Sequence, residues 1–229
     1  SGKLDPDSNV QFGEGGAGTF SDGKLTTGTK NSRIRWVLEQ FHAAVADGDI
    51  LYDSKPHIGT DVLVSVLKNI RKFITDALGE VMFSYKAEDM DIKDGRVASV
   101  KILSKDKKYS VACSDAVLAI GHSARDTFEM LYAKGVPMSR KAFSMGARIE
   151  HPQSLIDKSQ FGDFAGKKGM PKADYKLACH LQDRSVYTFC MCPGGYVVAA
   201  ASEEGGVVTN GMSERKRDGG NANAALLVS

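Results

Sequence analysis

Two places in this chain of 229 residues carry side chains of types and spacing that could do chemistry. His57 stands between Pro56 and Ile58 just before an expected helix, where backbone N–H groups could meet an anionic substrate while the imidazole transfers protons. Cys190 and Cys192 are one residue apart, which on a strand places both thiols on one face, buried as small apolar groups or near a redox centre. We therefore take His57, Cys190 and Cys192 as candidate catalytic residues, against the alternatives of a locally bonded histidine and cysteines buried without function.

A glycine-rich stretch forms the third candidate, and its sequence is Gly13-Glu14-Gly15-Gly16-Ala17-Gly18. The stretch matches the dinucleotide-binding pattern G-x-G-x-x-G, but it lacks the apolar strand before it and the apolar helix after it. An overlapping match to a phosphate-binding loop, Gly18 to Lys24, has Leu25 where a hydroxyl should bind Mg²⁺. The composition instead predicts a backbone that passes close to a flat or anionic ligand, with a flexible surface loop as the alternative.

The cysteines also allow a metal-based interpretation, because Cys179-His180 precedes the Cys190-x-Cys192 pair by about ten residues. These pairs lack the two-residue separation typical of zinc sites, so we predict no metal site and keep a zinc-binding or cysteine-based redox module as an alternative. Four cysteines are too few for a dense disulfide framework in a chain of this length, and we expect free thiols.

Composition excludes several classes of function. Lys and Arg number 30 against 28 Asp and Glu, and the most basic stretch, 213–217, is short and lacks aromatic residues, so we expect no nucleic-acid partner. No apolar run approaches the roughly 20 residues that span a bilayer, and the N-terminus lacks the order of a signal peptide. We expect a cytoplasmic protein that acts on a small molecule and contacts no membrane; the sequence does not specify its oligomeric state.

Helical signals dominate the first third of the chain. Apolar residues recur at helical spacing from Ile34 to Val45, and Asp47-Gly48 follows as a stop signal. A second helix is expected from Thr60, a residue suited to cap it, to Leu78, with Gly79 as its C-terminal stop.

Strand signals follow. We expect a strand over 80–85, a tight hairpin at Asp94-Gly95, and a further turn at 105–108. The uninterrupted apolar run Ala116–Ile120 predicts a strand covered on both faces, with a turn at Gly121-His122-Ser123 and a helix to Leu131, in the manner of a parallel sheet. Strand-like segments at 143–150, 176–182, 186–191 and 196–201 indicate an antiparallel second lobe. The fold class is therefore α/β, of mixed α+β type.

Five blocks of the sequence make it resemble the bacterial FAD-dependent proteins known as NAD(FAD)-utilising dehydrogenases. The blocks are Asn9–Leu25 (NVQFGEGGAGTFSDGKL), Lys55–Asp61 (KPHIGTD), Ala119–Asp126 (AIGHSARD), Arg148–Pro152 (RIEHP) and Cys190–Val198 (CMCPGGYVV). The resemblance implies an architecture similar to glutathione-reductase-like and fumarate-reductase-like flavoproteins, in which a Rossmann-type FAD-binding domain alternates with a substrate domain. It also implies that residues 1–135 are part of the FAD-binding domain and residues 136–229 a largely antiparallel substrate domain, cut short at its C-terminus.

The same resemblance implies the chemistry: an oxidoreductase that binds FAD and moves a hydride or electrons between NAD(P)H and an unknown acceptor. It assigns cofactor contacts to the glycine-rich stretch, to Thr19 and Lys24 beyond it, and to the turn residues Gly121 and His122. It also implies that His57 and the block Cys190–Val198 face the substrate side of the flavin. Two FAD-binding glycine segments of full-length relatives are absent from this sequence, so we expect a central piece that alone is inactive and holds little FAD. The alternative is a non-enzymatic interaction domain with ancestral flavoprotein motifs.

Overall fold

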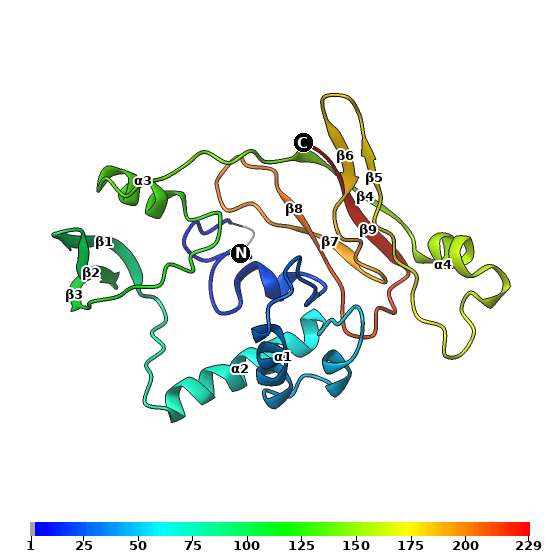
Figure 1. Cartoon of the computed structure of the whole chain (residues 1–229), viewed down its shortest axis with the longest axis horizontal. Helices are drawn as coiled ribbons and strands as arrows, with labels where there is room; N and C mark the ends of the chain where they lie inside the picture. Colours follow the sequence, from blue (N-terminus) through cyan, green and yellow to red (C-terminus); the bar gives the residue numbers. More distant parts are fainter. Residues whose placement is uncertain (1–2) are drawn as a thin grey trace. The chain divides into compact units, whose positions relative to one another are not determined.

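The computed structural model describes residues 3–229, which divide into two compact units (Figure 1). Unit 1 takes the described residues up to Phe73 together with Ala142–Ser229, and unit 2 is the segment between them, Ile74–Lys141. Helices and antiparallel sheets occur together in the described residues, which confirms the mixed α/β class. The assignment of cofactor and substrate roles to residues 1–135 and 136–229 stays a prediction.

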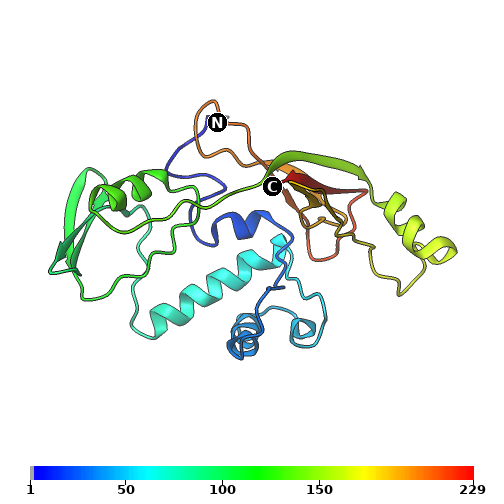
Figure 2. The same ribbon diagram turned by 45° about the horizontal axis from the view of Figure 1, so that its top comes forward.

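The helical half of unit 1 surrounds a small apolar core. It contains the short 3₁₀ helices η1 (Gly16–Phe20) and η2 (Gly48–Leu51), helix α1 (Arg33–Ala43) and the long helix α2 (Thr60–Asp76), which crosses into unit 2 at its last turn. Its core consists of the buried residues Ala44, Ala46, Ile50, Ile58, Leu63 and Val66. Figure 2 shows η1 lying alongside α2, where a side chain at Gly15 would collide with Leu67.

Both long helices end earlier than their apolar patterns predict. Val45 lies beyond α1 with a φ of 74° and is 58% exposed, so it is not part of the apolar stripe. Leu78 lies beyond α2 with a φ of 64° and is 94% exposed, because the chain reverses there and the Gly79 N–H bonds back to the Ile74 carbonyl at 2.8 Å. In both places a branched apolar residue takes the left-handed turn that sequence patterns assign to glycine.

The β half of unit 1 is built from two antiparallel sheets. The larger sheet has the order β4-β9-β6-β5, and Figure 1 shows β4 and β9 side by side along its length. The strands are β4 (Met145–Pro152), β5 (Ala178–His180), β6 (Ser185–Thr188) and β9 (Asn221–Val228), and the smaller sheet pairs β7 (Tyr196–Ala199) with β8 (Thr209–Met212). Helix α4 (Gln153–Phe161) and the 3₁₀ turn η3 (Gly162–Phe164) follow β4 directly.

The predicted antiparallel strands are confirmed; β4 has its predicted length but is shifted by two residues, and β5, β6 and β7 are shorter than expected. Helix α4 and strands β8 and β9 have no counterpart in the sequence-based prediction. The segment of β9 is small and polar at its start, Asn221-Ala222-Asn223-Ala224, and these residues are suitable for a strand because three of them are completely buried between neighbouring strands.

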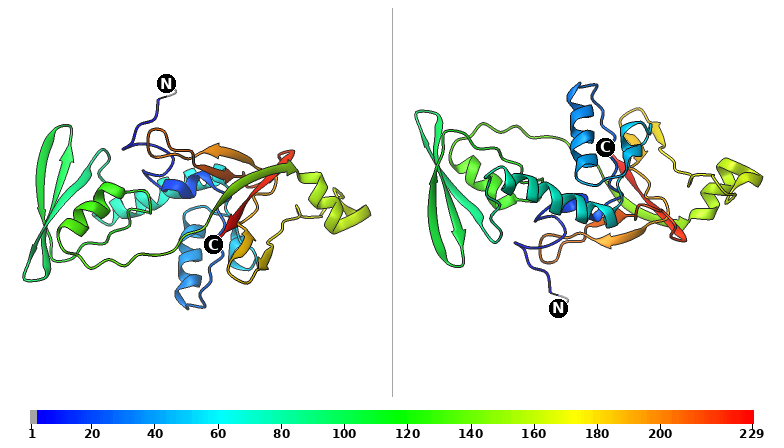
Figure 3. Two further views of the ribbon diagram at one scale, coloured as in Figure 1. Left: turned by 90° about the horizontal axis from the view of Figure 1, so that it is seen from above. Right: turned by 90° about the horizontal axis from the view of Figure 1, so that it is seen from below.

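Unit 2 is a three-stranded meander with one helix, seen as the twisted hairpin and its adjacent helix in Figure 3. Strands β1 (Lys86–Lys93) and β2 (Arg96–Ser104) meet at the predicted Asp94-Gly95 turn, and β3 (Lys107–Ala112) follows the predicted turn at Lys105 and Asp106. Helix α3 (Arg125–Ala133) is present as expected.

Two strands predicted for this segment are wrong in the structure. Residues 80–85 form no strand and contain a turn with Ser84 at a φ of 60°. Residues 116–120 belong to no helix or strand, and Val117 is 93% exposed. An apolar run becomes a strand only when neighbouring strands bond its backbone, and every strand pair in the described part of the chain is antiparallel and leaves this run out. A Rossmann-type parallel sheet therefore stays a prediction.

Within residues 3–229, no helix has both the length and the apolar character needed to cross a bilayer.

Candidate functional site

A buried carboxylate lies at the centre of the polar contacts in unit 1. Asp22 is 3% exposed. It lies near the end of the first sequence block, Asn9–Leu25, which we call the glycine-rich block. The Arg217 guanidinium donates through Nε to Asp22 Oδ1 at 2.9 Å and through Nη2 to Oδ2, which is a two-point ion pair. Ser213 donates its hydroxyl to the same Oδ1 at 2.9 Å. These contacts connect the glycine-rich block to residues almost two hundred positions further along the chain.

Lys24 connects the same block to the cysteine segment. Its ammonium lies 3.6 Å from Asp22 Oδ2 and donates a hydrogen bond to the carbonyl of Met191, a completely buried residue between the two cysteines. A charged side chain held by one carboxylate and one carbonyl is fixed in position while it remains 21% exposed. The structure thus places the positive charge of Lys24 beside the cysteine block.

His57 is joined to the glycine-rich block through the backbone. An antiparallel bridge pairs His57 with Lys24, and the Ile58 N–H bonds to the Gly23 carbonyl at 3.0 Å. The hydroxyl of Thr60 donates to the Ser21 carbonyl, so the expected helix cap instead connects α2 to this block. The first and second sequence blocks therefore form one local structure.

Both ring nitrogens of His57 have partners. Nε2 lies 3.1 Å from the Arg215 carbonyl, which can only accept, so we assign the proton to Nε2 and leave Nδ1 to accept from Arg215 Nη1 at 3.4 Å. Burial, followed by the positive charge of Arg217, lowers the pKa of His57 below its ordinary value of 6.5. The imidazole is therefore neutral at pH 7, and a proton-transfer role, which stays a prediction, requires Arg215 to release Nδ1.

Arg215 is itself held by several carboxylates. Its guanidinium pairs with Asp47 at 2.9 Å and with Asp49, and its backbone N–H donates to Asp61 at 2.8 Å. A side chain at Gly59, which has a φ of 87°, would collide with the Arg215 backbone. Close packing therefore determines where this arginine meets His57.

The two cysteines differ in environment, although a strand would place them alike. Residues 189–191 belong to no strand, and Cys190 is exposed whereas Cys192 is 6% exposed. Burial, followed by the charge of Asp22, raises the pKa of Cys192 to about 11, so this thiol is protonated and poorly nucleophilic at pH 7. All four cysteines are free. Residues 3–229 contain no group of three or more His, Cys, Asp or Glu side chains placed to hold a metal ion.

The glycine-rich stretch begins in turns and continues as η1. Its predicted cofactor residues are Gly13, Glu14, Gly15, Gly16, Ala17, Gly18 and Thr19. The Thr19 hydroxyl donates to the Gly16 carbonyl at 2.8 Å, and Glu14 pairs with Arg71 at 3.4 Å. A Cβ atom added at Gly13 or Gly18 would meet open space, so the backbone surface is bare at these two positions. No strand precedes η1 between residues 3 and 15, which agrees with a stretch that is not a dinucleotide fingerprint.

The remaining predicted cofactor residues, Gly121 and His122, lie in unit 2 and are described within that unit alone. Gly121 has a φ of 69° and open space beside it, and His122 Nδ1 lies 3.0 Å from the Ser123 hydroxyl.

Among the predicted site residues of unit 1, the structure brings Lys24 and His57 together and places Lys24 near Cys192.

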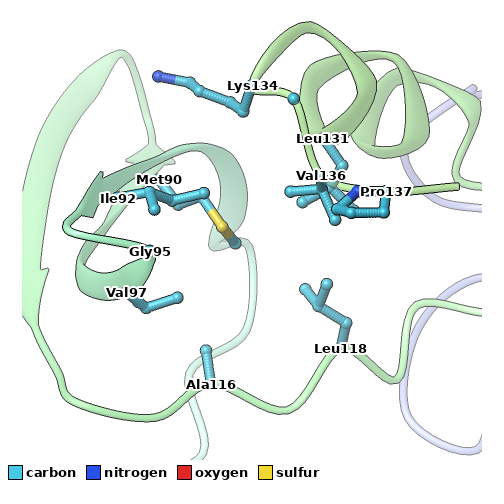
Figure 4. A pocket seen from close by; sticks show the side chains of 11 residues that line it. Met90, Ile92, Gly95, Val97, Ala116, Leu118, Leu131, Lys134, Val136 and Pro137 are labelled. Carbon is cyan, nitrogen blue, oxygen red and sulfur yellow. The ribbon is translucent and has the colours of Figure 1, made fainter.

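Unit 2 contains an apolar cavity of about 480 Å³ between the meander and α3 (Figure 4). Its walls include Met90, Val97, Leu118, Leu131 and Val136. Lys134 supplies the charged group at this cavity, and its ammonium already pairs with Asp89 at 2.8 Å. None of the predicted catalytic or cofactor residues lines it, so we do not assign the flavin to this cavity.

Sequence reasoning missed four residues of the buried cluster: Asp22, Ser213, Arg215 and Arg217. The sequence marks the segment 213–217 only as a short basic stretch. In the structure this segment is a turn, because the Arg217 N–H bonds to the Glu214 carbonyl at 3.1 Å and Arg217 has a φ of 51°, so no strand-like alternation in the sequence signals the positions of these side chains. No local pattern identifies Asp22 as their partner.

Comparisons with known proteins agree with a flavoprotein. Residues 142–229 match the family model described as FAD-dependent protein, C-terminal domain-like. The chain is also 52% identical over 229 residues to an uncharacterized protein of Clostridium beijerinckii (strain ATCC 51743 / NCIMB 8052). That alignment covers 99% of this chain and 42% of the relative, so the chain spans about two fifths of the length of the relative. The family match supports an FAD-dependent protein family; the narrower family of NAD(FAD)-utilising dehydrogenases stays a prediction.

Proposed function

We propose that this chain is the central part of an FAD-dependent oxidoreductase that moves a hydride or electrons between NAD(P)H and an acceptor. One observation carries the proposal: the glycine-rich block is bonded through Asp22 to Ser213 and Arg217, which lie in the segment that matches FAD-dependent proteins. A second link runs from the Asn210 amide to the Phe20 carbonyl at 2.8 Å. The block and the matched segment thus form one local structure, as a shared cofactor site requires.

The glycine-rich block is suitable for a flat ligand. The open space beside Gly13 and Gly18 leaves the peptide planes uncovered, and an aromatic ring system can approach such a backbone to van der Waals distance. The long-range bonds of Asp22 and Lys24 fix this block relative to the matched segment, so its surface is formed before any ligand binds.

FAD, when bound, supplies the acceptor and donor of the hydride or electrons, and the protein supplies orientation and electrostatics. In our proposal Gly13 to Thr19 offer backbone contacts, Lys24 holds a fixed positive charge at the site, and Gly121 with His122 belong to the second contact of the FAD domain. Cys190 presents an accessible thiol on the substrate side. His57 donates from Nε2 to the Arg215 carbonyl and so keeps the Arg215 backbone in place. Its Nδ1 becomes available for proton transfer only when Arg215 Nη1 moves away.

The experiment is to express the longer protein that contains this chain and to record its visible spectrum, then to add NADH or NADPH without oxygen. The proposal predicts a flavin absorption band that is bleached by at least one of the two nucleotides. The same protein with His57→Gln should still bind flavin, and slower bleaching would support a role of His57 in proton transfer. A longer protein that purifies colourless and takes up no FAD would favour the interaction-domain alternative.

The 229-residue chain offers a second test. We expect it to bind FAD weakly, because the chain covers only 42% of the length of its relative and the remainder of such a protein can supply further cofactor contacts. Tight binding of FAD by this chain alone, seen as quenched flavin fluorescence at micromolar concentration, would contradict that expectation. It would assign the main cofactor contacts to the glycine-rich block.

A further inference from the structure

An arginine and an asparagine on adjacent strands share one face of the larger sheet. Arg148 of β4 is opposite Ala225, and Asn223 of β9 is opposite Glu150, so the two side chains are diagonal neighbours on the same face. Arg148 Nη1 donates to Asn223 Oδ1 at 2.8 Å. On β8, a Cβ atom at Gly211 would collide with this amide and approach the guanidinium to 2.6 Å, so glycine at this position leaves room for the pair.

This pair has more donors than acceptors. Asn223 is completely buried, and its Nδ2 amide has no hydrogen-bond partner in the described chain. The Nε–H of Arg148 is also buried without a partner. Asn223 Oδ1 already accepts from Arg148. The groups of the two side chains that still lack a partner are therefore N–H donors. Leaving a buried donor unpaired is destabilising, and two on neighbouring side chains indicate an acceptor that completes them.

The pair also has an uncompensated positive charge. No carboxylate within salt-bridge distance of Arg148 is found among residues 3–229, and burial lowers the pKa of its guanidinium. The charged forms of the Cys192 and Cys190 thiols would raise the pKa of Arg148, but the high pKa of Cys192 keeps that thiol neutral. Asp22 interacts with Cys192 but already pairs with Arg217 and Lys24.

We propose that Arg148 and Asn223 form a binding site for a carboxylate, next to Cys190 and Cys192. A guanidinium edge offers two parallel N–H donors that match the two oxygens of a planar carboxylate, and the Asn223 amide adds a third donor. One arginine without a counter-charge suits a monoanion, since Lys24, the other cation that interacts with Cys192 among residues 3–229, already pairs with Asp22. Arg148 is half-buried, so part of its side chain is open to an approaching carboxylate. This inference does not depend on the flavin proposal.

The test is a titration of the 229-residue chain, labelled with ¹⁵N, against sodium acetate at pH 7 and constant ionic strength. The Nε–H signal of Arg148, assigned by its loss in Arg148→Lys, should shift and saturate at millimolar acetate. Sodium chloride at equal ionic strength should leave it unchanged, and inorganic phosphate should bind at least about tenfold more weakly. A signal that does not move, that needs molar acetate, or that responds equally to phosphate or chloride overturns the proposal, as does an ordered water as the sole occupant of the site.

Two variants keep the test independent of folding defects. Asn223→Asp places a carboxylate beside Arg148 with no change in size, so it should abolish the acetate response and raise the melting temperature of the chain. A fall in melting temperature with the response retained would show that Arg148 is not the uncompensated cation. Arg140→Gln removes an exposed arginine and serves as the matched control, with an unchanged acetate response expected.

Discussion

Removal of the charge on Asp22 tests whether the buried cluster holds unit 1 together. In Asp22→Asn, Arg217 and Lys24 lose their counter-charge while the side chain keeps its size. Loss of one partner from a buried ion pair costs about 3–5 kcal/mol. Arg217 and Lys24 are still 16% and 21% exposed, so water compensates in part, and we expect the lower end, about 3 kcal/mol.

The assay is urea denaturation of the 229-residue chain, followed by circular dichroism, with the free energy of unfolding compared between variants. The matched control is Glu39→Gln, which breaks an exposed ion pair of 2.7 Å with Arg35 and should cost less than about 0.5 kcal/mol. The double variant Asp22→Asn, Arg217→Gln should lose less than the sum of the single changes, because the two side chains share one interaction. A loss below about 1 kcal/mol for Asp22→Asn would refute the reasoning.

Three further predictions concern the same unit. Gly59→Ala should destabilise the chain by at least about 2 kcal/mol in the same urea assay, since the new methyl group meets the Arg215 backbone at a left-handed φ. His57 should titrate below 6.5 by NMR, and because the unfolded chain then binds more protons, stability should fall as the pH drops below 6.5 through the folded pKa, less steeply in His57→Gln. Cys190 should react rapidly with a maleimide at pH 7, whereas Cys192 should react only after unfolding, as mass spectrometry of the labelled peptides can measure.

Each of these predictions has a control and a contradicting result. Gly166→Ala also has a positive φ but meets no atom within 4 Å, so a loss equal to that of Gly59→Ala would remove the steric argument. A stability that falls as steeply with pH in His57→Gln as in the unchanged chain would remove the assignment of this pH dependence to His57. Equal labelling rates for Cys190 and Cys192 would show that Cys192 is reachable in the folded chain.

Features that depend on neighbouring residues were predictable from the sequence. The hairpin at Asp94-Gly95 follows from the ease with which this pair takes positive φ, with observed values of 50° and 74°. Helix α2 follows from a regular apolar stripe, and its start at Thr60 was anticipated. These signals act over a few residues, so no tertiary information is needed.

Features that depend on distant residues were not predictable. The pair of Asp22 and Arg217 joins residues 195 positions apart, and neither has a pattern that identifies the other. Residues 116–120 show the opposite failure, because the apolar pattern of a buried strand is present while hydrogen-bonding neighbours are not. Periodicity indicates which faces are apolar, whereas pairing is decided by where the rest of the chain lies.

The central claim, that this chain belongs to a working flavoprotein, is tested most directly by the visible spectrum of the longer protein purified from its expression host. Our account predicts the absorption band of oxidised flavin, present in stoichiometric amount and bleached by NADH or NADPH. A colourless protein that remains colourless after incubation with excess FAD and removal of the free cofactor would contradict it.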